Sequence, residues 1–129
     1  MSPEDTRIPT VAVVDDDPTV TIILSRILGA SGYAVAVHVS GEDLLDAVSA
    51  RRYDAICLDL GLPGIDGLET LTRLTQQGHT TPVILFTASA DDVRDQALAA
   101  GAFACVSKTG GWGDLRSAVE AAVTDRRNA

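Results

Sequence analysis

The sequence of 129 residues has few cysteines and no long hydrophobic segment. Its two cysteines, Cys57 and Cys105, lie far apart in apolar stretches, which favours buried free thiols over a disulfide framework or a thiolate metal site. No apolar run approaches the roughly 18–20 residues that cross a bilayer. Residues 1–9 are polar and of mixed charge, unlike a secretion signal. We therefore expect a cytoplasmic protein with no membrane partner.

Basic residues are also scarce, since 10 Lys and Arg stand against 18 Asp and Glu, for a net charge of −8. A surface of this sign repels phosphate backbones and anionic membranes, so we expect no direct binding to nucleic acid. The 46% hydrophobic and 22% charged content is that of an ordinary globular domain. A chain of this length allows one domain, expected to span residues 1–129 with a core at about 10–123.

Short apolar segments rich in β-branched residues alternate with segments of helical periodicity along the whole chain. Helical spacing is clearest at two places, where apolar residues recur at i, i+3, i+4, i+7 and i+8: Val20, Ile23, Leu24, Ile27, Leu28, and Leu115, Ala118, Val119, Ala122, Val123. The predicted strands are residues 11–14, 33–39, 54–58, 82–86 and 102–107. This order predicts an α/β doubly wound domain with a parallel sheet between helices.

The remaining helices are indicated by caps and by shorter apolar patterns. Asp17 followed by Pro18 is typical of a helix start, and Ser40 precedes another helical stretch. A third helix is expected at about 67–76. The fourth, at about 90–100, has only a sparse apolar face, so we expect it to be the least firmly held.

Polar side chains follow four of the five predicted strands. The first strand leads into Asp15 and Asp16, the third into Asp59, the fourth ends at Thr87, and the fifth leads to Lys108. In this fold class, ligands bind beyond the carboxyl ends of the strands. We therefore expect these side chains to meet at one edge of the sheet.

The chemistry of such a cluster points to a cation and to phosphate. Asp15, Asp16 and Asp59 brought together place three negative charges in a small volume, which costs free energy unless a cation or a proton neutralises them. Ligand sets made only of oxygen select a hard ion, and Mg²⁺ is favoured because it also accepts phosphate oxygens. A carboxylate beside Mg²⁺, a lysine and a threonine hydroxyl suits in-line phosphoryl transfer.

In these residues the sequence resembles the receiver domain of bacterial two-component response regulators, over about residues 10–123. The resemblance rests on Val-Val-Asp-Asp-Asp-Pro, Leu-Asp-Leu-Gly-Leu-Pro-Gly-Ile-Asp-Gly, Phe-Thr-Ala-Ser and Val-Ser-Lys, in that order. It implies a flavodoxin-like fold with a five-stranded parallel sheet in the order 2-1-3-4-5 and five helices. It also implies that Asp59 takes a phosphoryl group from the phosphohistidine of a sensor histidine kinase or phosphotransfer protein.

The resemblance further assigns roles to the site residues. Asp16 and Asp59 would ligate Mg²⁺ directly, Asp15 mainly through water, and the backbone carbonyl of Gly61 would complete the protein ligands. Thr87 and Lys108 would hold phosphoryl oxygens. The output surface would be formed by the fourth helix, fifth strand and fifth helix, used for homodimers or for a target. Such a domain is not an enzyme for other substrates and catalyses only its own phosphorylation and dephosphorylation.

The sequence departs from the family pattern in two places that bear on switching. Lys108 is followed by Thr109, where many receivers have a proline, and Cys105 stands where the family usually has an aromatic residue that turns inward. With no ring at this position, we expect the signal to pass through backbone and loop shifts.

Three other functions remain open from the sequence. Asp15 and Asp17 form an Asp-x-Asp pair, as in aspartate-nucleophile phosphatases of the haloacid-dehalogenase type, although no capping insert is present. A flavin-binding module would need a hydroxyl- and glycine-rich loop where this chain has three carboxylates. A receiver-like interaction domain that signals without phosphorylation is conceivable because of Thr109 and Cys105.

Overall fold

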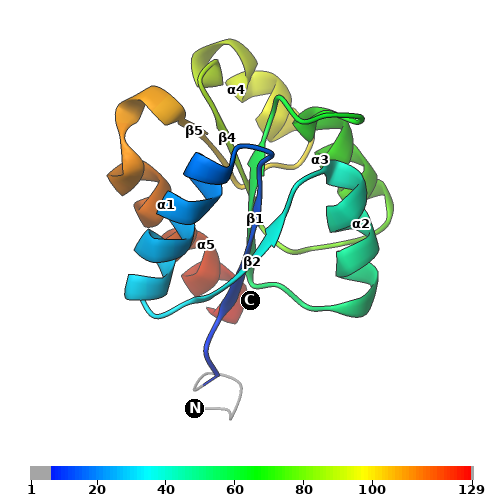
Figure 1. Cartoon of the computed structure of the whole chain (residues 1–129). Coiled ribbons are helices and arrows are strands. Elements are labelled where there is room, and N and C mark those ends of the chain that lie inside the picture. Colours follow the sequence, from blue (N-terminus) through cyan, green and yellow to red (C-terminus); the bar gives the residue numbers. More distant parts are fainter. Residues whose placement is uncertain (1–6, 129) are drawn as a thin grey trace.

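The computed structural model describes residues 7–128, and the side chains of residues 7–127. Residues 1–6 and 129 of the expected domain lie outside the described residues. Strands and helices alternate along the chain (Figure 1), with the following bounds: β1 Thr10–Val14, α1 Pro18–Ala30, β2 Ala34–His38, α2 Gly41–Ala50, β3 Ala55–Asp59, α3 Gly67–Gln76, β4 Val83–Thr87, α4 Ala90–Ala99, β5 Ala104–Ser107, a 3-10 turn Lys108–Gly110 and α5 Trp112–Asn128.

The strands of the described chain form one sheet of five in the order β2-β1-β3-β4-β5, and every neighbouring pair is parallel. The predicted α/β fold and strand order are therefore confirmed. The register sets Asp59 beside Phe86 and Thr87 beside Ser107. Because all strands run the same way, the residues that follow them lie at a single edge, which we call the carboxyl edge.

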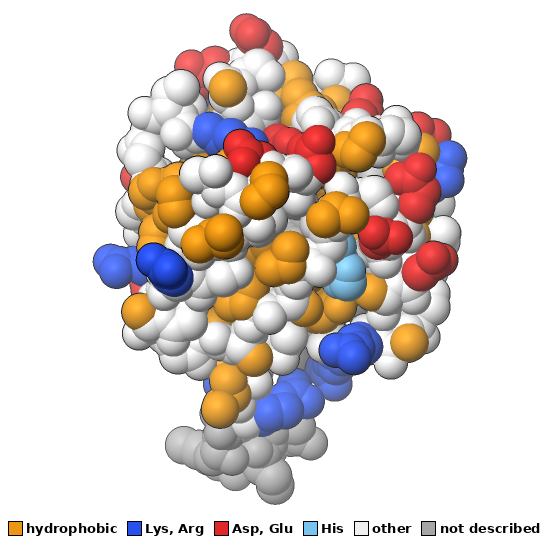
Figure 2. Space-filling model, in the orientation of Figure 1, with side chains coloured by type: hydrophobic (Ala, Val, Ile, Leu, Met, Phe, Trp, Pro, Cys, Tyr) orange, Lys and Arg blue, Asp and Glu red, His pale blue; other side chains and the backbone are white. Residues whose placement is uncertain are grey.

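The sheet separates two layers of helices (Figure 1). Successive residues of β1 point to opposite faces, as a pleated strand requires: Val11 and Val13 pack with the Leu24 and Leu28 side of α1, whereas Ala12 packs with α2 and α3. Helices α1 and α5 cover one face, and α2 and α3 cover the other, where α4 also packs. Both faces of β1, β3 and β4 are buried, which explains the continuous apolar runs of these strands. The edge strand β2 is partly exposed, and hydrophobic side chains gather on the surface over it (Figure 2).

Both predicted helix caps are present, whereas α4 starts without a side-chain cap. The Asp17 carboxylate accepts a hydrogen bond from the Thr19 N–H at 2.9 Å, and the Ser40 hydroxyl accepts one from the Asp43 N–H at 3.1 Å. At α4 the cap residue Ser89 makes no such bond. A side-chain cap contributes about 1 kcal/mol, so the helix with the sparsest apolar face also lacks this support.

Four predicted strands begin one or two residues too early. In two of them, the strands predicted from residues 33 and 102, the end of the preceding helix uses the first residue. The N–H of Tyr33 donates to the Leu28 carbonyl, and the N–H of Ala102 donates to the Ala97 carbonyl. Both residues therefore close the preceding helix and do not start a strand. Within the described chain, every helix is too short or too polar to cross a membrane.

Both cysteines are buried free thiols, as predicted. Burial raises the pKa of Cys57 to about 12. It also raises the pKa of Cys105, although the Arg94 guanidinium partly opposes this shift. Both thiols therefore stay protonated and act as small core residues.

Candidate functional site

The carboxyl edge brings together the acidic residues that the sequence analysis selected. Carboxylate oxygens of Asp15, Asp16 and Asp59 all lie within 4.8 Å of one another. Asp15 is 3% exposed, Asp59 is half-buried, and Asp16 is exposed. The three carboxylates therefore differ in exposure: Asp15 is buried, Asp59 is partly buried and Asp16 lies in solvent.

Lys108 lies across this cluster. Its Nζ is 3.0 Å from an Asp15 oxygen and 3.1 Å from an Asp59 oxygen. The Lys108–Thr109 peptide bond is trans, and Thr109 N–H donates to the Ser107 hydroxyl at 3.1 Å in the 3-10 turn. The turn itself thus delivers the lysine to the site without a following proline.

The second oxygen of Asp15 is held by the backbone. Asp15 Oδ1 accepts a hydrogen bond from the Asp17 N–H at 2.9 Å, and the Asp15 N–H donates to the His38 carbonyl at 3.1 Å. These bonds tie the β1–α1 loop to the end of β2. Asp17 itself caps α1 and is not among the three clustered carboxylates. The Asp-x-Asp pair that the phosphatase alternative requires is therefore not assembled.

The electrostatics favour a neutral form of Asp59 more than is usual for an aspartate. Burial raises the pKa of Asp59, and the Asp15 charge raises it further. The Lys108 ammonium and a hydrogen bond from the Gly61 backbone oppose that rise without cancelling it. Ionised Asp59 is therefore short of positive charge, even with Lys108 in contact.

Lys108 connects the acidic cluster to the aromatic residues behind it. Burial lowers the pKa of Lys108, but its bonds to Asp15 and Asp59 outweigh burial and raise it overall. The ammonium also lies 5.7 Å from the centre of the Phe86 ring, within cation–π range. Phe86 in turn packs against Trp112, the first residue of α5, with ring centres 5.7 Å apart. The sequence analysis missed this contact.

Thr87 is 5% exposed at the end of β4. Its hydroxyl lies 3.3 Å from the Ser89 hydroxyl and accepts a hydrogen bond from the Ser89 N–H at 3.3 Å. This bond holds the loop that leads into α4. One residue further on, the Ala90 carbonyl accepts a weak hydrogen bond from the Cys105 thiol at 3.8 Å. Thr87, the α4 start and β5 are thus linked by successive contacts.

The donor set fits a hard divalent cation. It contains carboxylate oxygens only, with no thiolate or imidazole in the described cluster. The positive charge near Asp59 does not balance the negative charge of the cluster. Gly61 lies exposed in the β3–α3 loop beside Asp59, where its N–H bonds to that carboxylate. These residues therefore fit Mg²⁺ better than a softer metal.

The comparisons agree with this geometry. The model of the response regulator receiver domain matches residues 11–120. The transcriptional regulatory protein TcrA of Mycobacterium tuberculosis is 42% identical over 78 residues, which cover 60% of this chain and 31% of TcrA. The chain thus spans about a third of that relative's length.

Solved structures of whole receiver domains match over almost their full length. A putative response regulator from Chloroflexus aurantiacus superposes with a TM-score of 0.85 at 31% identity, covering 92% of this chain and 99% of that one. The receiver domain of the sensor histidine kinase PA1611 from Pseudomonas aeruginosa, solved with a magnesium ion in its active-site cleft, gives 0.82 at 25% identity with the same coverage. The chain therefore belongs to the response regulator receiver domain family.

Proposed function

We propose that Asp59 accepts a phosphoryl group from the phosphohistidine of a sensor histidine kinase or a phosphotransfer protein. A carboxylate oxygen of Asp59 forms a bond to phosphorus as the phosphorus–nitrogen bond of the donor breaks, and the imidazole leaves with the electron pair. The observation that carries the proposal is the position of Asp59, partly buried beside two other carboxylates and in contact with the Lys108 ammonium.

The proposal includes Mg²⁺, held by Asp16 and Asp59 directly, by Asp15 mainly through water, and by the Gly61 carbonyl. The acidic cluster supports this ligand set. The magnesium in the related PA1611 receiver supports it independently. When bound, the ion supplies positive charge toward the phosphoryl oxygens.

Lys108 and Thr87 have complementary roles in this proposal. Lys108 offsets part of the negative charge of Asp15 and Asp59 before transfer, and one of its three donors then reaches a phosphoryl oxygen while Asp15 keeps the ammonium in place. Thr87 donates its hydroxyl hydrogen to another phosphoryl oxygen. To do so it gives up its contact with Ser89.

Loss of the Thr87–Ser89 contact provides a route to the output surface. Ser89 immediately precedes α4, a helix without a side-chain cap. The Arg94 guanidinium on α4 donates a hydrogen bond to the Cys105 carbonyl of β5 at 3.3 Å. A movement of α4 would therefore displace or break this contact with β5. The signal would then reach the surface formed by α4, β5 and α5, for a homodimer or a target. Unchanged amide NMR signals on that surface after phosphorylation would contradict this route.

The test is labelling with acetyl phosphate, a small phosphodonor, followed by intact mass. Wild-type protein is expected to gain one phosphoryl group with Mg²⁺ and none with EDTA. Asp59→Asn should not be labelled, whereas Asp46→Asn, which changes an exposed carboxylate in α2, should be labelled normally. Labelling that persists in Asp59→Asn refutes the assignment.

A receiver-like module that signals without phosphorylation is the second candidate. It is favoured by Cys105, whose thiol already bonds to the α4 start. In that case a partner would bind wild-type protein and Asp59→Asn equally, with or without acetyl phosphate. The proposed function requires a difference between the two.

The proposal treats residues 1–129 as one receiver domain with its core at about 10–123, acting in the cytoplasm as a signalling domain. The chain spans 31% of TcrA. Any transcriptional output would therefore need a further domain or a partner protein that binds the nucleic acid.

A further inference from the structure

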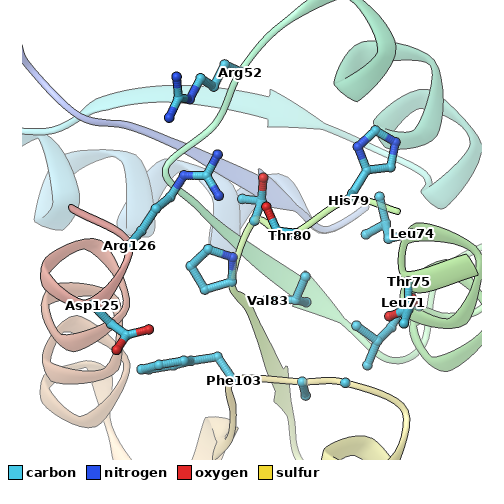
Figure 3. A pocket seen from close by; sticks show the side chains of 14 residues that line it. Arg52, Leu71, Leu74, Thr75, His79, Thr80, Val83, Phe103, Asp125 and Arg126 are labelled. Carbon is cyan, nitrogen blue, oxygen red and sulfur yellow. Dashed lines mark hydrogen bonds between the residues drawn. The ribbon is translucent and has the colours of Figure 1, made fainter. Parts of the chain in front are cut away.

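A cavity of about 620 Å³ lies at the opposite edge of the sheet from Asp59 (Figure 3). Its walls come from the segment before β3, the end of α3, the α3–β4 loop, the segment before β5 and the end of α5. This amino edge is far from the phosphoacceptor cluster in the fold, because the strands run between the two. Its volume is in the range of small-molecule sites, roughly 300–1,000 Å³.

Arginines gather around this cavity. Arg52 and Arg126 line it, and their guanidinium groups lie near each other at one end of the lining (Figure 3). An adjoining hollow of about 220 Å³ shares these two arginines and adds Arg51. Arg127 also lies at this end, where its guanidinium donates to the Arg7 carbonyl. Five of the chain's ten basic residues thus occur at one end of a protein with net charge −8.

The charge on Arg126 is not fully compensated. Its Nε is buried and has no hydrogen-bond partner. Burial lowers the pKa of Arg126, and the charges of Arg52 and Arg7 lower it further, against a smaller opposing effect of Asp54. Asp54 is itself engaged, because it accepts a hydrogen bond from the Thr10 N–H at 2.8 Å. A buried donor without an acceptor destabilises the protein, and an anionic ligand that accepts its hydrogen bond would remove that cost.

The nearby carboxylates do not fill this role. Asp54 forms its ion pair with Arg7 at 3.7 Å, and Asp125, although it lines the cavity, is exposed. Guanidinium groups match the geometry of phosphate and carboxylate oxygens, since they present several donors in one plane.

The rest of the wall suits an apolar or ring-shaped body. Phe103 lines the cavity and is 37% exposed, whereas the other phenylalanine of the chain, Phe86, is 3% exposed. Leu71, Leu74 and Val83 form apolar lining, and Thr80 adds a hydroxyl. Pockets for small molecules combine such apolar walls with a few polar groups that fix orientation.

We propose that this cavity binds a small organic anion, whose phosphate or carboxylate group contacts Arg52 and Arg126 and whose ring or apolar part packs on Phe103. The site lies on the opposite edge from Asp59 and does not depend on phosphorylation there.

The test uses AMP, benzoate, adenosine and inorganic phosphate as probes, with the full chain carrying Asp59→Asn in EDTA so that the phosphoacceptor site is silent. Amide NMR titration should show AMP, benzoate or both shifting residues 79–83 and 101–103. Whichever binds identifies the anionic group. The anionic probe should bind at least about tenfold more tightly than adenosine, as a charge-assisted hydrogen bond predicts.

Variants locate the contacts. Arg126→Gln should weaken binding by about tenfold or more, Arg126→Lys should weaken it less, and Phe103→Ala should bring AMP down to the affinity of inorganic phosphate. Arg116→Gln removes an exposed arginine that pairs with Glu120 on the outer side of α5 and should change nothing. The proposal is overturned if neither anion shifts these amides below about 10 mM, if adenosine binds as tightly as the anion that shifts them, or if folded Arg126→Gln binds that anion normally.

Discussion

The two edges of the sheet carry uncompensated charge of opposite sign. At the carboxyl edge three carboxylates face a single ammonium, whereas at the amino edge Arg126 has a buried Nε without a partner among neighbouring arginines. Between them the three central strands β1, β3 and β4 are apolar and almost fully buried. Charge is therefore kept out of the core and concentrated where loops and strand ends supply the side chains.

The two edges obtain their charges in different ways. At the carboxyl edge, neighbouring strands in fixed register deliver Asp59 and Thr87 from their last residues. At the amino edge, arginines come from a loop and from the last turn of α5, where the helix dipole favours cations. Strand register thus fixes the side chains of the first edge, whereas those of the second depend on a loop and a helix end.

The largest expected effect comes from disturbing the backbone under the carboxyl edge. In Gly67→Ala the new Cβ would lie 2.3 Å from the Asp59 carbonyl oxygen and 2.8 Å from the Leu60 Cα. We expect a loss of about 2–3 kcal/mol in the free energy of unfolding, measured with urea. The control Gly29→Ala has no atom within 4 Å of the new Cβ and should lose nothing. Equal stability of both variants would show that α3 is not fixed against β3.

Removing charge at the carboxyl edge should stabilise the fold. Because the pKa of Asp59 is raised in the folded state, the proton that Asp59 binds stabilises that state below the unfolded pKa of about 3.9, and this stability is lost as pH rises through the folded pKa. Asp59→Asn should therefore gain stability relative to wild type as pH increases from about 4 to 7. A gain that does not change with pH would argue against the raised pKa.

A smaller, opposed pair of effects separates the causes of that pKa. Lys108→Met should raise the pKa of Asp59 further, because the opposing ammonium is lost, and Asp15→Asn should lower it, because a neighbouring negative charge is lost. Carbon-detected NMR titration of the Asp59 carboxyl measures both. Shifts of the same sign would mean that rearrangement outweighs charge. Lys108→Met should also keep the fold and lose most of the response to acetyl phosphate.

The smallest effect is expected at the amino edge. Arg52→Gln removes one of the charges that lower the pKa of Arg126 and should raise the free energy of unfolding by a few tenths of a kcal/mol at low salt, since these groups are partly exposed. The gain should fade in about 0.5 M NaCl. The measurement is the thermal unfolding of Arg52→Gln, compared with that of the control variant Arg116→Gln. A loss of stability would indicate that the packing of the Arg52 side chain stabilises the fold more than its repulsion of Arg126 destabilises it.

The sequence was sufficient for the alternation of elements and for the edge at which Asp15, Asp59 and Lys108 meet, because parallel strands end together. It could not give the contacts themselves, which depend on strand register and on the turn after β5. The amino-edge cavity escaped prediction because its lining comes from five separate segments with no common pattern. The only signals were the Arg51–Arg52 and Arg126–Arg127 doublets.

Phe86 contacts both the Lys108 ammonium and the Trp112 indole, and these contacts would let the protein report on its own site optically. Trp112 is the sole indole of the chain, so its emission has one origin. Any event that draws the ammonium toward a new partner changes the field around the neighbouring rings. A rise or fall in Trp112 fluorescence would thus follow occupancy of the carboxyl-edge site in real time and without a label. It would report from the first turn of α5, which is part of the proposed output surface.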